Sequence, residues 1–226
     1  MKLNQKTKSL LAISIAAVFS LSIVAVGAMP NAIADDDSKK LHFAKKPDFV
    51  SNGCIITGYA SNLSSEAQAA LDCSMQAWLD NKGTALQYQI QITGMELIDT
   101  DDNTQDDLYQ LHIHKATAVD STPANPKGPH QLNVYRGPAF DDADLIVLPV
   151  QGMLVGIWDD GDENLSYGEP DNSHKLTEDL QLLCDSQIFA AGHGDIEDVP
   201  GHHAPYVKML LEPTSEGLKA CKKLGF

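Results

Sequence analysis

Strict alternation of apolar and polar residues is the feature that most limits how this chain can fold. In the run ALQYQIQI, residues 85–92, three glutamines alternate with the apolar residues Leu86, Tyr88, Ile90 and Ile92. Side chains two residues apart on a strand point to the same side, so this run predicts a half-buried antiparallel strand. CSMQAWL precedes it across DNKG (80–83), a sequence typical of a tight hairpin turn.

Other short runs have the composition of strands and are separated by Asp, Asn, Gly and Pro. They are CIITGYA, LYQLHIH, QLNVY, DLIVLPV, MLVGIW, QIFAAG and YVKMLLE. Two segments interrupt them as expected helices: TEDLQLLC with Thr177 as N-cap, and TSEGLKACKKLG with Gly225 as a stop. The pattern predicts an all-β, antiparallel sandwich or barrel with one or two short helices.

The first 34 residues have the order of a secretory signal peptide. A lysine-containing tip precedes the apolar run 10–26, and the small residues Ala32 and Ala34 precede DDDSKK. We expect cleavage after Ala34; the alternative is an uncleaved membrane anchor, since a spanning helix needs roughly 20 apolar residues. Residues 35–48 are predicted to be a charged linker, 49–213 the β-domain and 214–226 a short C-terminal helix.

Charge and cysteine content restrict the environment and the partners. The full chain carries a net charge of −15, and loss of the three leader lysines makes it −18. Such a surface repels phosphate backbones and anionic lipid, so we expect no nucleic-acid partner and no membrane contact beyond an uncleaved leader. Four cysteines in an exported chain indicate two disulfides, and we favour the nearest pairs, Cys54–Cys73 and Cys184–Cys221.

The run LYQLHIHKAT contains two histidines that are two residues apart. On a strand His112 and His114 share one face, roughly 6.6 Å apart along the chain, and two imidazoles at that spacing can converge on one metal ion. The alternative is that they form the polar, solvent-facing half of an alternating strand. The pair alone leaves both interpretations open.

Further histidines strengthen the metal interpretation. His130 follows a loop that returns from the HIH run, and His193 ends the run QIFAAGH. Neutral imidazoles without a cysteine ligand favour copper or zinc. His202 or His203 is a reserve ligand; the remaining two, His42 and His174, are expected to be surface residues.

Other chemistries have less support in the sequence. DTDDNTQDD and DDGDENLSYGE lack the glycine at the sixth position and the glutamate at the twelfth position of a calcium-binding EF-hand loop, so both are expected to be solvated loops. No GxSxG is present, and the cysteines are expected to be structural, so nucleophilic hydrolysis is not indicated.

A series of short motifs resembles the CHRD domain, a β-sandwich module named after chordin and also found in exported microbial proteins. The motifs are GTALQYQIQITGM, LHIH, the Gly128–Pro129 step, the region from Trp158 to Leu183, the strand ending in His193, and YVKMLLEP. The resemblance covers about residues 49–213 and implies a sandwich of immunoglobulin- or superoxide-dismutase-like type. The chain departs from the family at Lys208, where arginine is usual, and in its longer acidic loop after His193.

A weaker likeness concerns the copper site of Cu/Zn superoxide dismutase. That enzyme also has HxH on a strand, then GPH, then a histidine at a later strand end, an order that His112, His114, His130 and His193 reproduce. The zinc-loop histidines and the anion-guiding arginine near the C-terminus are absent, since Arg136 is the only arginine in the chain. The likeness implies a copper site without the rest of the enzyme.

These observations lead to one preferred function and one alternative. We expect an exported CHRD-type module without catalytic residues, which binds a metal ion, copper in preference to zinc, or an extracellular protein partner. The expected ligands are His112, His114, His130 and His193. The alternative is a copper-only oxidoreductase like superoxide dismutase, for which Lys208 is the nearest cation that could attract an anionic substrate.

Overall fold

A computed structural model describes residues 46–97, 107–135, 142, 144–164, 174–194 and 205–226. The expected leader (1–34), most of the charged linker (35–48), and His42, His202 and His203 lie outside these ranges. Within them, no helix is both long enough and apolar enough to cross a bilayer.

The described domain is mainly β. Its strands are β1 (Phe49–Ser51), β2 (Ile55–Ile56), β3 (Asp72–Leu79), β4 (Ala85–Thr93), β5 (Leu108–Lys115), β6 (His130–Tyr135), β7 (Ile146–Leu148), β8 (Met153–Asp159), β9 (Ile188–Gly194) and β10 (Pro205–Pro213). The helices are α1 (Ser65–Ala70), α2 (Leu176–Cys184) and α3 (Ser215–Leu224), with the 3-10 turns η1 (Gly58–Asn62), η3 (Pro149–Gln151) and η4 (Asp160–Asn164). The expected antiparallel, β-rich class with few short helices is confirmed.

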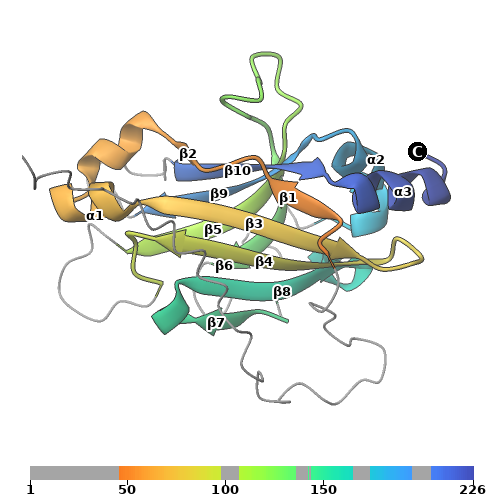
Figure 1. Cartoon of the computed structure of the whole chain (residues 1–226), viewed down its shortest axis with the longest axis horizontal. Helices are drawn as coiled ribbons and strands as arrows, with labels where there is room; N and C mark the ends of the chain where they lie inside the picture. Colours follow the sequence, from red (N-terminus) through yellow and green to blue (C-terminus); the bar gives the residue numbers. More distant parts are fainter. Residues whose placement is uncertain (1–45, 98–106, 136–141, 143, 165–173, 195–204) are drawn as a thin grey trace, which may run out of the picture. The chain divides into compact units, whose positions relative to one another are not determined.

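Nine strands form one curled antiparallel sheet in the order β6-β5-β9-β10-β1-β3-β4-β8-β7, and β2 pairs only with β10 (Figure 1). The short strand β1, which alternation could not reveal in three residues, pairs with both β10 and β3 and joins the two halves of the sheet. One main cluster of buried apolar side chains draws on both halves, including β4, β5, β8 and β10. The curl therefore encloses the core.

The hairpin of β3 and β4 forms where the sequence predicts it. Leu79 pairs with Leu86 at the end of the hairpin, and the four apolar residues of β4 are fully buried while its glutamines are half-buried. Asp80 fixes the turn, because its carboxylate accepts hydrogen bonds from the amide and hydroxyl of Thr84 at 2.7 and 3.0 Å. The alternating pattern and the turn sequence thus account for this part of the sheet.

The helices required one correction. Thr177 is not the N-cap of α2, which begins at Leu176 with Lys175 as its cap. Instead, the amide and hydroxyl of Thr177 both donate to Oδ1 of Asp160, at 3.1 and 2.9 Å. The carboxylate of Asp160 in η4 therefore accepts a hydrogen bond from a backbone amide in the first turn of α2, which has no acceptor within the helix. The helix α1 was not expected from the sequence, whereas α3 ends at Gly225 as predicted.

Two disulfides pair the cysteines as predicted. Cys54 is bonded to Cys73, and Cys184 at the end of α2 is bonded to Cys221 in α3. The second disulfide ties together two helices that lie side by side in Figure 1. Two disulfides indicate an oxidising, extracytoplasmic environment.

Candidate metal centre

The strand β5 presents His112 and His114 on one face and its core residues on the other. Leu111 and Ile113 belong to the main core, as the alternation predicts. His112 and His114 are also buried, with exposed fractions of 2% and 6%. The interpretation of the pair as the solvent-facing half of a strand is therefore wrong.

Neighbouring strands account for this burial. On β9, Phe189 lies opposite His114 and Ala191 lies opposite His112. On β10, in turn, Leu210 lies opposite Phe189 and Lys208 lies opposite Ala191. Residues paired across strands point to the same side of a sheet. Phe189, Ala191 and Leu210 form a second, smaller apolar cluster on this face of the sheet. The histidines are thus flanked by apolar side chains on a face that does not belong to the main core.

His130, the first residue of β6, completes a group of three. It pairs with His114 across the β5–β6 ladder. Its ring centroid lies 4.3 Å from that of His114 and 4.1 Å from that of His112. One ligand nitrogen from each of the three imidazoles can be chosen so that all lie within 4.8 Å of one another. Such a group is compact enough to hold a metal ion.

His193 lies on the same face, at the end of β9, and is buried as well. Its ring centroid is 5.3 Å from that of His112 and 6.3 Å from that of His114. The compact group contains His112, His114 and His130 but not His193. We call all four residues the histidine cluster; the role of His193 as a fourth ligand remains a prediction.

The tautomer of His114 follows from its hydrogen bond. Nδ1 lies 3.1 Å from the carbonyl oxygen of Gly128. A carbonyl only accepts, so Nδ1 carries the proton and donates it. Nε2 is buried and has no hydrogen-bond partner among the described residues. Burial, reinforced by His130 and His193, holds the pKa of His114 well below its usual value, so the ring is neutral and the Nε2 lone pair is available.

The ring of Phe189 fixes the plane of His114. The two rings are stacked, with centroids 4.9 Å apart and an interplanar angle of 13°. This stacking and the Gly128 hydrogen bond act on the ring from different directions. Together they restrict how far the imidazole can rotate, which preorganises it for a ligand.

Lys208 has a different environment from the one expected of an anion-attracting cation. Its side chain is buried, and Nζ donates to Oδ1 of Asn125 at 3.0 Å and to the carbonyl oxygen of Pro126 at 2.8 Å. Desolvation lowers its pKa. The ammonium group is thus directed at the loop between β5 and β6.

His174 and the described acidic loop have their own polar partners. His174 precedes α2, and its Nδ1 lies 3.8 Å from a carboxylate oxygen of Glu178, in keeping with a surface position. The DTDD run lies outside the described residues. In DDGDE, Asp162 is buried and its Oδ2 accepts a hydrogen bond from the amide of Asp159 at 2.7 Å, so it is not the solvated residue that was expected.

A second buried polar group was not identified from the sequence. The hydroxyl of Tyr88 in β4 donates to Oδ2 of Asp142 at 2.5 Å, and Asp142 is only 2% exposed. Burial, and then the charge of Asp162, raise the pKa of Asp142 to about 7. Gly156 in β8 leaves the space, since a Cβ there would lie 2.1 Å from the Tyr88 hydroxyl. A glycine within the apolar run MLVGIW was the one available signal.

Comparison with known proteins returned no family model, no curated protein and no solved structure that matches the chain. The described residues form an antiparallel, disulfide-bonded β-protein. It has a three-histidine group that could hold a metal ion, with His112 and His114 buried and His130 half-buried.

Proposed function

We propose that this chain is an extracytoplasmic, non-catalytic module of CHRD type that binds copper. His112, His114 and His130 hold the ion and His193 supplies a fourth ligand. The observation that carries the proposal is the three-histidine group, whose ligand nitrogens lie within 4.8 Å of one another, with His112 and His114 buried and His130 half-buried. The order of the four histidines in the sequence, which resembles that of the copper ligands in Cu/Zn superoxide dismutase, supports the same residues.

The sandwich architecture is part of the proposal. The strands β6, β5, β9 and β10 form one half of the curled sheet, and β1, β3, β4, β8 and β7 form the other. Their inward side chains contribute to one core, which is the arrangement expected of two facing layers of a sandwich. In this description the histidine cluster lies on the outer face of the first layer.

Copper is preferred to zinc on chemical grounds. Imidazole nitrogens suit both ions, and for a given set of nitrogen ligands copper(II) binds more tightly than zinc(II). Neither ion needs an anionic ligand to be held by neutral imidazoles, and the low pKa of His114 keeps one of them neutral. The oxidising environment that the disulfides indicate is compatible with copper(II).

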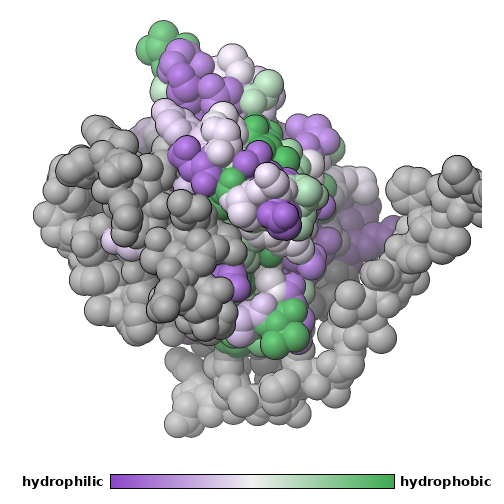
Figure 2. Space-filling model, turned by 90° about the vertical axis from the view of Figure 1, so that its left-hand side faces the viewer, coloured by the Kyte–Doolittle hydropathy of each residue, from purple (hydrophilic) through white to green (hydrophobic). Residues whose placement is uncertain are grey.

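Secretion or display at the cell surface, after cleavage of the leader, belongs to the same proposal. A protein partner has less support than a metal ion. On the face shown in Figure 2, the hydrophobic residues of the described part form small groups interspersed with hydrophilic ones. Larger apolar surfaces usually mark interaction sites. The three-histidine group supports a metal ion directly, so we place the metal ion before a partner.

The test is a copper(II) titration of residues 35–226 with the disulfides intact, followed by EPR. We expect one equivalent to bind with nitrogen hyperfine splitting, and the signal to be lost when His112 and His114 are both replaced by alanine. His174→Ala is the matched control, because His174 lies outside the group. Copper affinity that survives in the double variant would contradict the site.

Two further measurements refine the result. A titration in which copper and zinc compete at equal buffered concentrations tests the metal, and zinc retained against copper would overturn the copper assignment. A superoxide assay of the copper-loaded protein tests the oxidoreductase alternative. We expect no turnover above that of free copper, since Lys208, the nearest candidate cation, is engaged by Asn125 and Pro126.

A further inference from the structure

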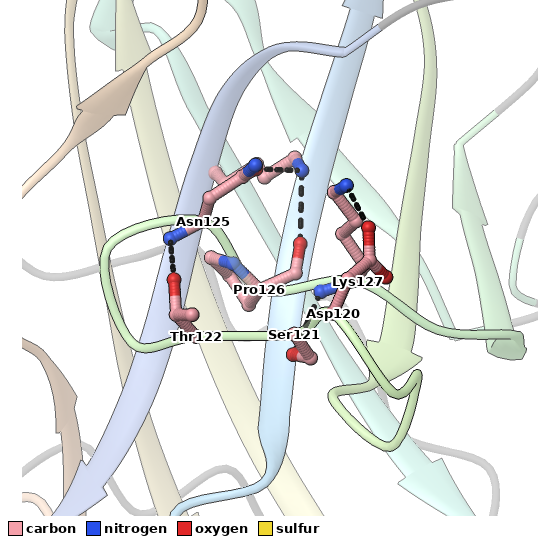
Figure 3. A network of polar contacts seen from close by, with 7 residues as sticks. Asp120, Ser121, Thr122, Asn125, Pro126 and Lys127 are labelled. Carbon is pink, nitrogen blue, oxygen red and sulfur yellow. Dashed lines mark hydrogen bonds and ion pairs between the residues drawn. The ribbon is translucent and has the colours of Figure 1, made fainter.

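The loop between β5 and β6 is an internally braced arm. We use the term arm for residues 116–129, drawn in part in Figure 3. Thr122 and Asn125 exchange two backbone hydrogen bonds, of 3.3 and 3.0 Å, across its tip. Lower down, Lys127 forms an ion pair with Asp120, and its amide donates to Oγ of Ser121 at 3.0 Å. These contacts hold the residues of the arm together as one unit.

Lys208 connects this arm to the sheet. It lies in β10, more than 80 residues away in sequence, yet its Nζ donates to both Asn125 (3.0 Å) and Pro126 (2.8 Å). The residue is 7% exposed. A buried ammonium is costly unless hydrogen bonds compensate it, so these two acceptors and the lysine depend on one another.

The chain that follows Pro126 leads directly to the histidine cluster. The backbone at Gly128 passes so close to β5 that a Cβ there would lie 1.7 Å from the carbonyl oxygen of Lys115. The carbonyl of Gly128 accepts the Nδ1 proton of His114, and His130 is two residues further on. Two of the three histidines in the compact group therefore depend on where the arm returns to the sheet.

We propose that Lys208 is a positioning residue of the metal centre. It holds the arm at Asn125 and Pro126, and thereby places the Gly128 carbonyl that selects the Nδ1-protonated tautomer of His114 and leaves Nε2 for the metal. The inference rests on the proposed function for its metal readout, but the tautomer can be measured without metal.

The direction of the change in copper affinity distinguishes two possible roles of Lys208. If Lys208 acted only through its charge, replacing it by a neutral residue would remove repulsion of the cation and strengthen copper binding. If it acts by positioning, the same replacement weakens binding. Loss of a group that orients a ligand typically lowers metal affinity 10- to 100-fold. The two roles therefore predict opposite directions.

The first experiment compares the metal-free wild type with Lys208→Met and Lys208→Arg by long-range proton–nitrogen NMR of the histidine side chains. Methionine keeps length and apolar packing, and arginine keeps charge and donors. We expect His114 to be protonated only at Nδ1 in the wild type and in Lys208→Arg, and to show a mixture of tautomers in Lys208→Met. An unchanged single tautomer in Lys208→Met would overturn the proposal.

The second experiment measures copper(II) affinity against a competing chelator. We expect about a tenfold loss in Lys208→Met, recovery in Lys208→Arg, and no change in Lys219→Met, which removes an exposed lysine paired with Glu216. Asn125→Ala keeps the charge of Lys208 but removes one of its two hydrogen-bond acceptors, so it should also weaken copper binding. It replaces Lys208→Met in the test if that variant does not fold.

Wild-type copper affinity in both Asn125→Ala and Lys208→Met would contradict the positioning role of Lys208. A wild type that binds no copper would contradict the proposed function alone, and the tautomer measurement would still decide the role of Lys208.

Discussion

Two of the places where the described part of the protein buries ionisable side chains differ in whether they offer an atom to a ligand. In the histidine cluster the buried groups are bases, and burial lowers the pKa of His114. At the contact of Tyr88 with Asp142 the buried groups are acids, and burial raises the pKa of Asp142 to about 7. In both regions the low-dielectric surroundings disfavour the charged form.

The two regions differ in how their polar atoms are used. Tyr88 and Asp142 satisfy each other with a direct hydrogen bond. His114, in contrast, donates from Nδ1 to Gly128 while its Nε2 has no partner among the described residues. Burial of polar groups thus does not by itself indicate a binding site. An unused lone pair beside two other imidazoles does.

The largest expected effect is stabilisation by copper. With free copper ten thousand times above its Kd, the free energy of unfolding should rise by about 5.5 kcal/mol, because the ion binds the folded chain. Chemical denaturation with and without copper measures the difference. The His112→Ala, His114→Ala double variant should gain almost nothing. An equal gain in that variant would show that the ion stabilises the chain from somewhere else.

The histidine cluster also shows how much of the site the sequence could predict. Alternation placed His112 and His114 on one face, and His130 and His193 were expected beside or at the end of other strands. The pairing of those strands with β5 is seen only in the structure. Burial was not predicted, since an alternating polar face is normally solvated. Phe189 and Ala191 lie on that face beside the histidines. Their run IFAAG is continuously apolar, so its sequence does not show which side of the strand faces the main core.

The second region was less accessible to sequence analysis. Tyr88 and Asp142 are 54 residues apart, and Asp142 lies in a loop whose polar composition is typical of solvated turns. The hydrogen bonds between Lys208 and the arm could not be predicted for the same reason, since they join residues more than 80 positions apart. Periodicity reports local geometry, so it predicted strands and shared faces but not contacts made by loops.

The next largest effect concerns the pH dependence of stability through Asp142. Its pKa is about 7 in the folded chain and 3.8 in the reference state, so between these values the folded state binds more protons. Stability therefore falls as pH rises from about 4 to about 7. A shift of this size corresponds to roughly 4 kcal/mol. Asp142→Asn should lack this loss and gain stability relative to wild type above pH 7.

The measurement is the free energy of unfolding at pH 4, 5.5, 7 and 8 for both proteins. Asp72→Asn is a suitable control, since Asp72 is exposed at the start of β3. Copper affinity at pH 7 should be unchanged in Asp142→Asn. Parallel pH profiles of wild type and Asp142→Asn would mean that Asp142 does not titrate in this window.

A smaller loss is expected from Gly156→Ala. The added methyl would lie 2.1 Å from the Tyr88 hydroxyl and 2.9 Å from Oδ2 of Asp142, so the two side chains must separate. Overpacking of this kind costs about 2 kcal/mol. Gly58→Ala is the matched control, because a Cβ at Gly58 meets nothing within 4 Å. Thermal unfolding of both variants measures the difference, and an unchanged melting temperature in Gly156→Ala would refute the close contact.

The smallest effect should come from Phe189→Leu. The substitution removes the ring stacked on His114 and leaves the Gly128 hydrogen bond in place. Aromatic stacking contributes about 1 kcal/mol beyond buried area, so stability should fall by roughly that amount. Copper affinity should fall by no more than about fivefold, because one of the two restraints on the imidazole remains.

Phe49→Leu is the matched control for the small loss of copper affinity expected in Phe189→Leu. Phe49 is as deeply buried as Phe189 but belongs to the main core, which contains none of the histidines. The same substitution there should lower the free energy of unfolding and leave copper affinity unchanged. If both variants lost affinity equally, general loosening of the fold would explain the loss. If only Phe189→Leu lost it, the stacked ring would be part of what orients His114 toward the metal.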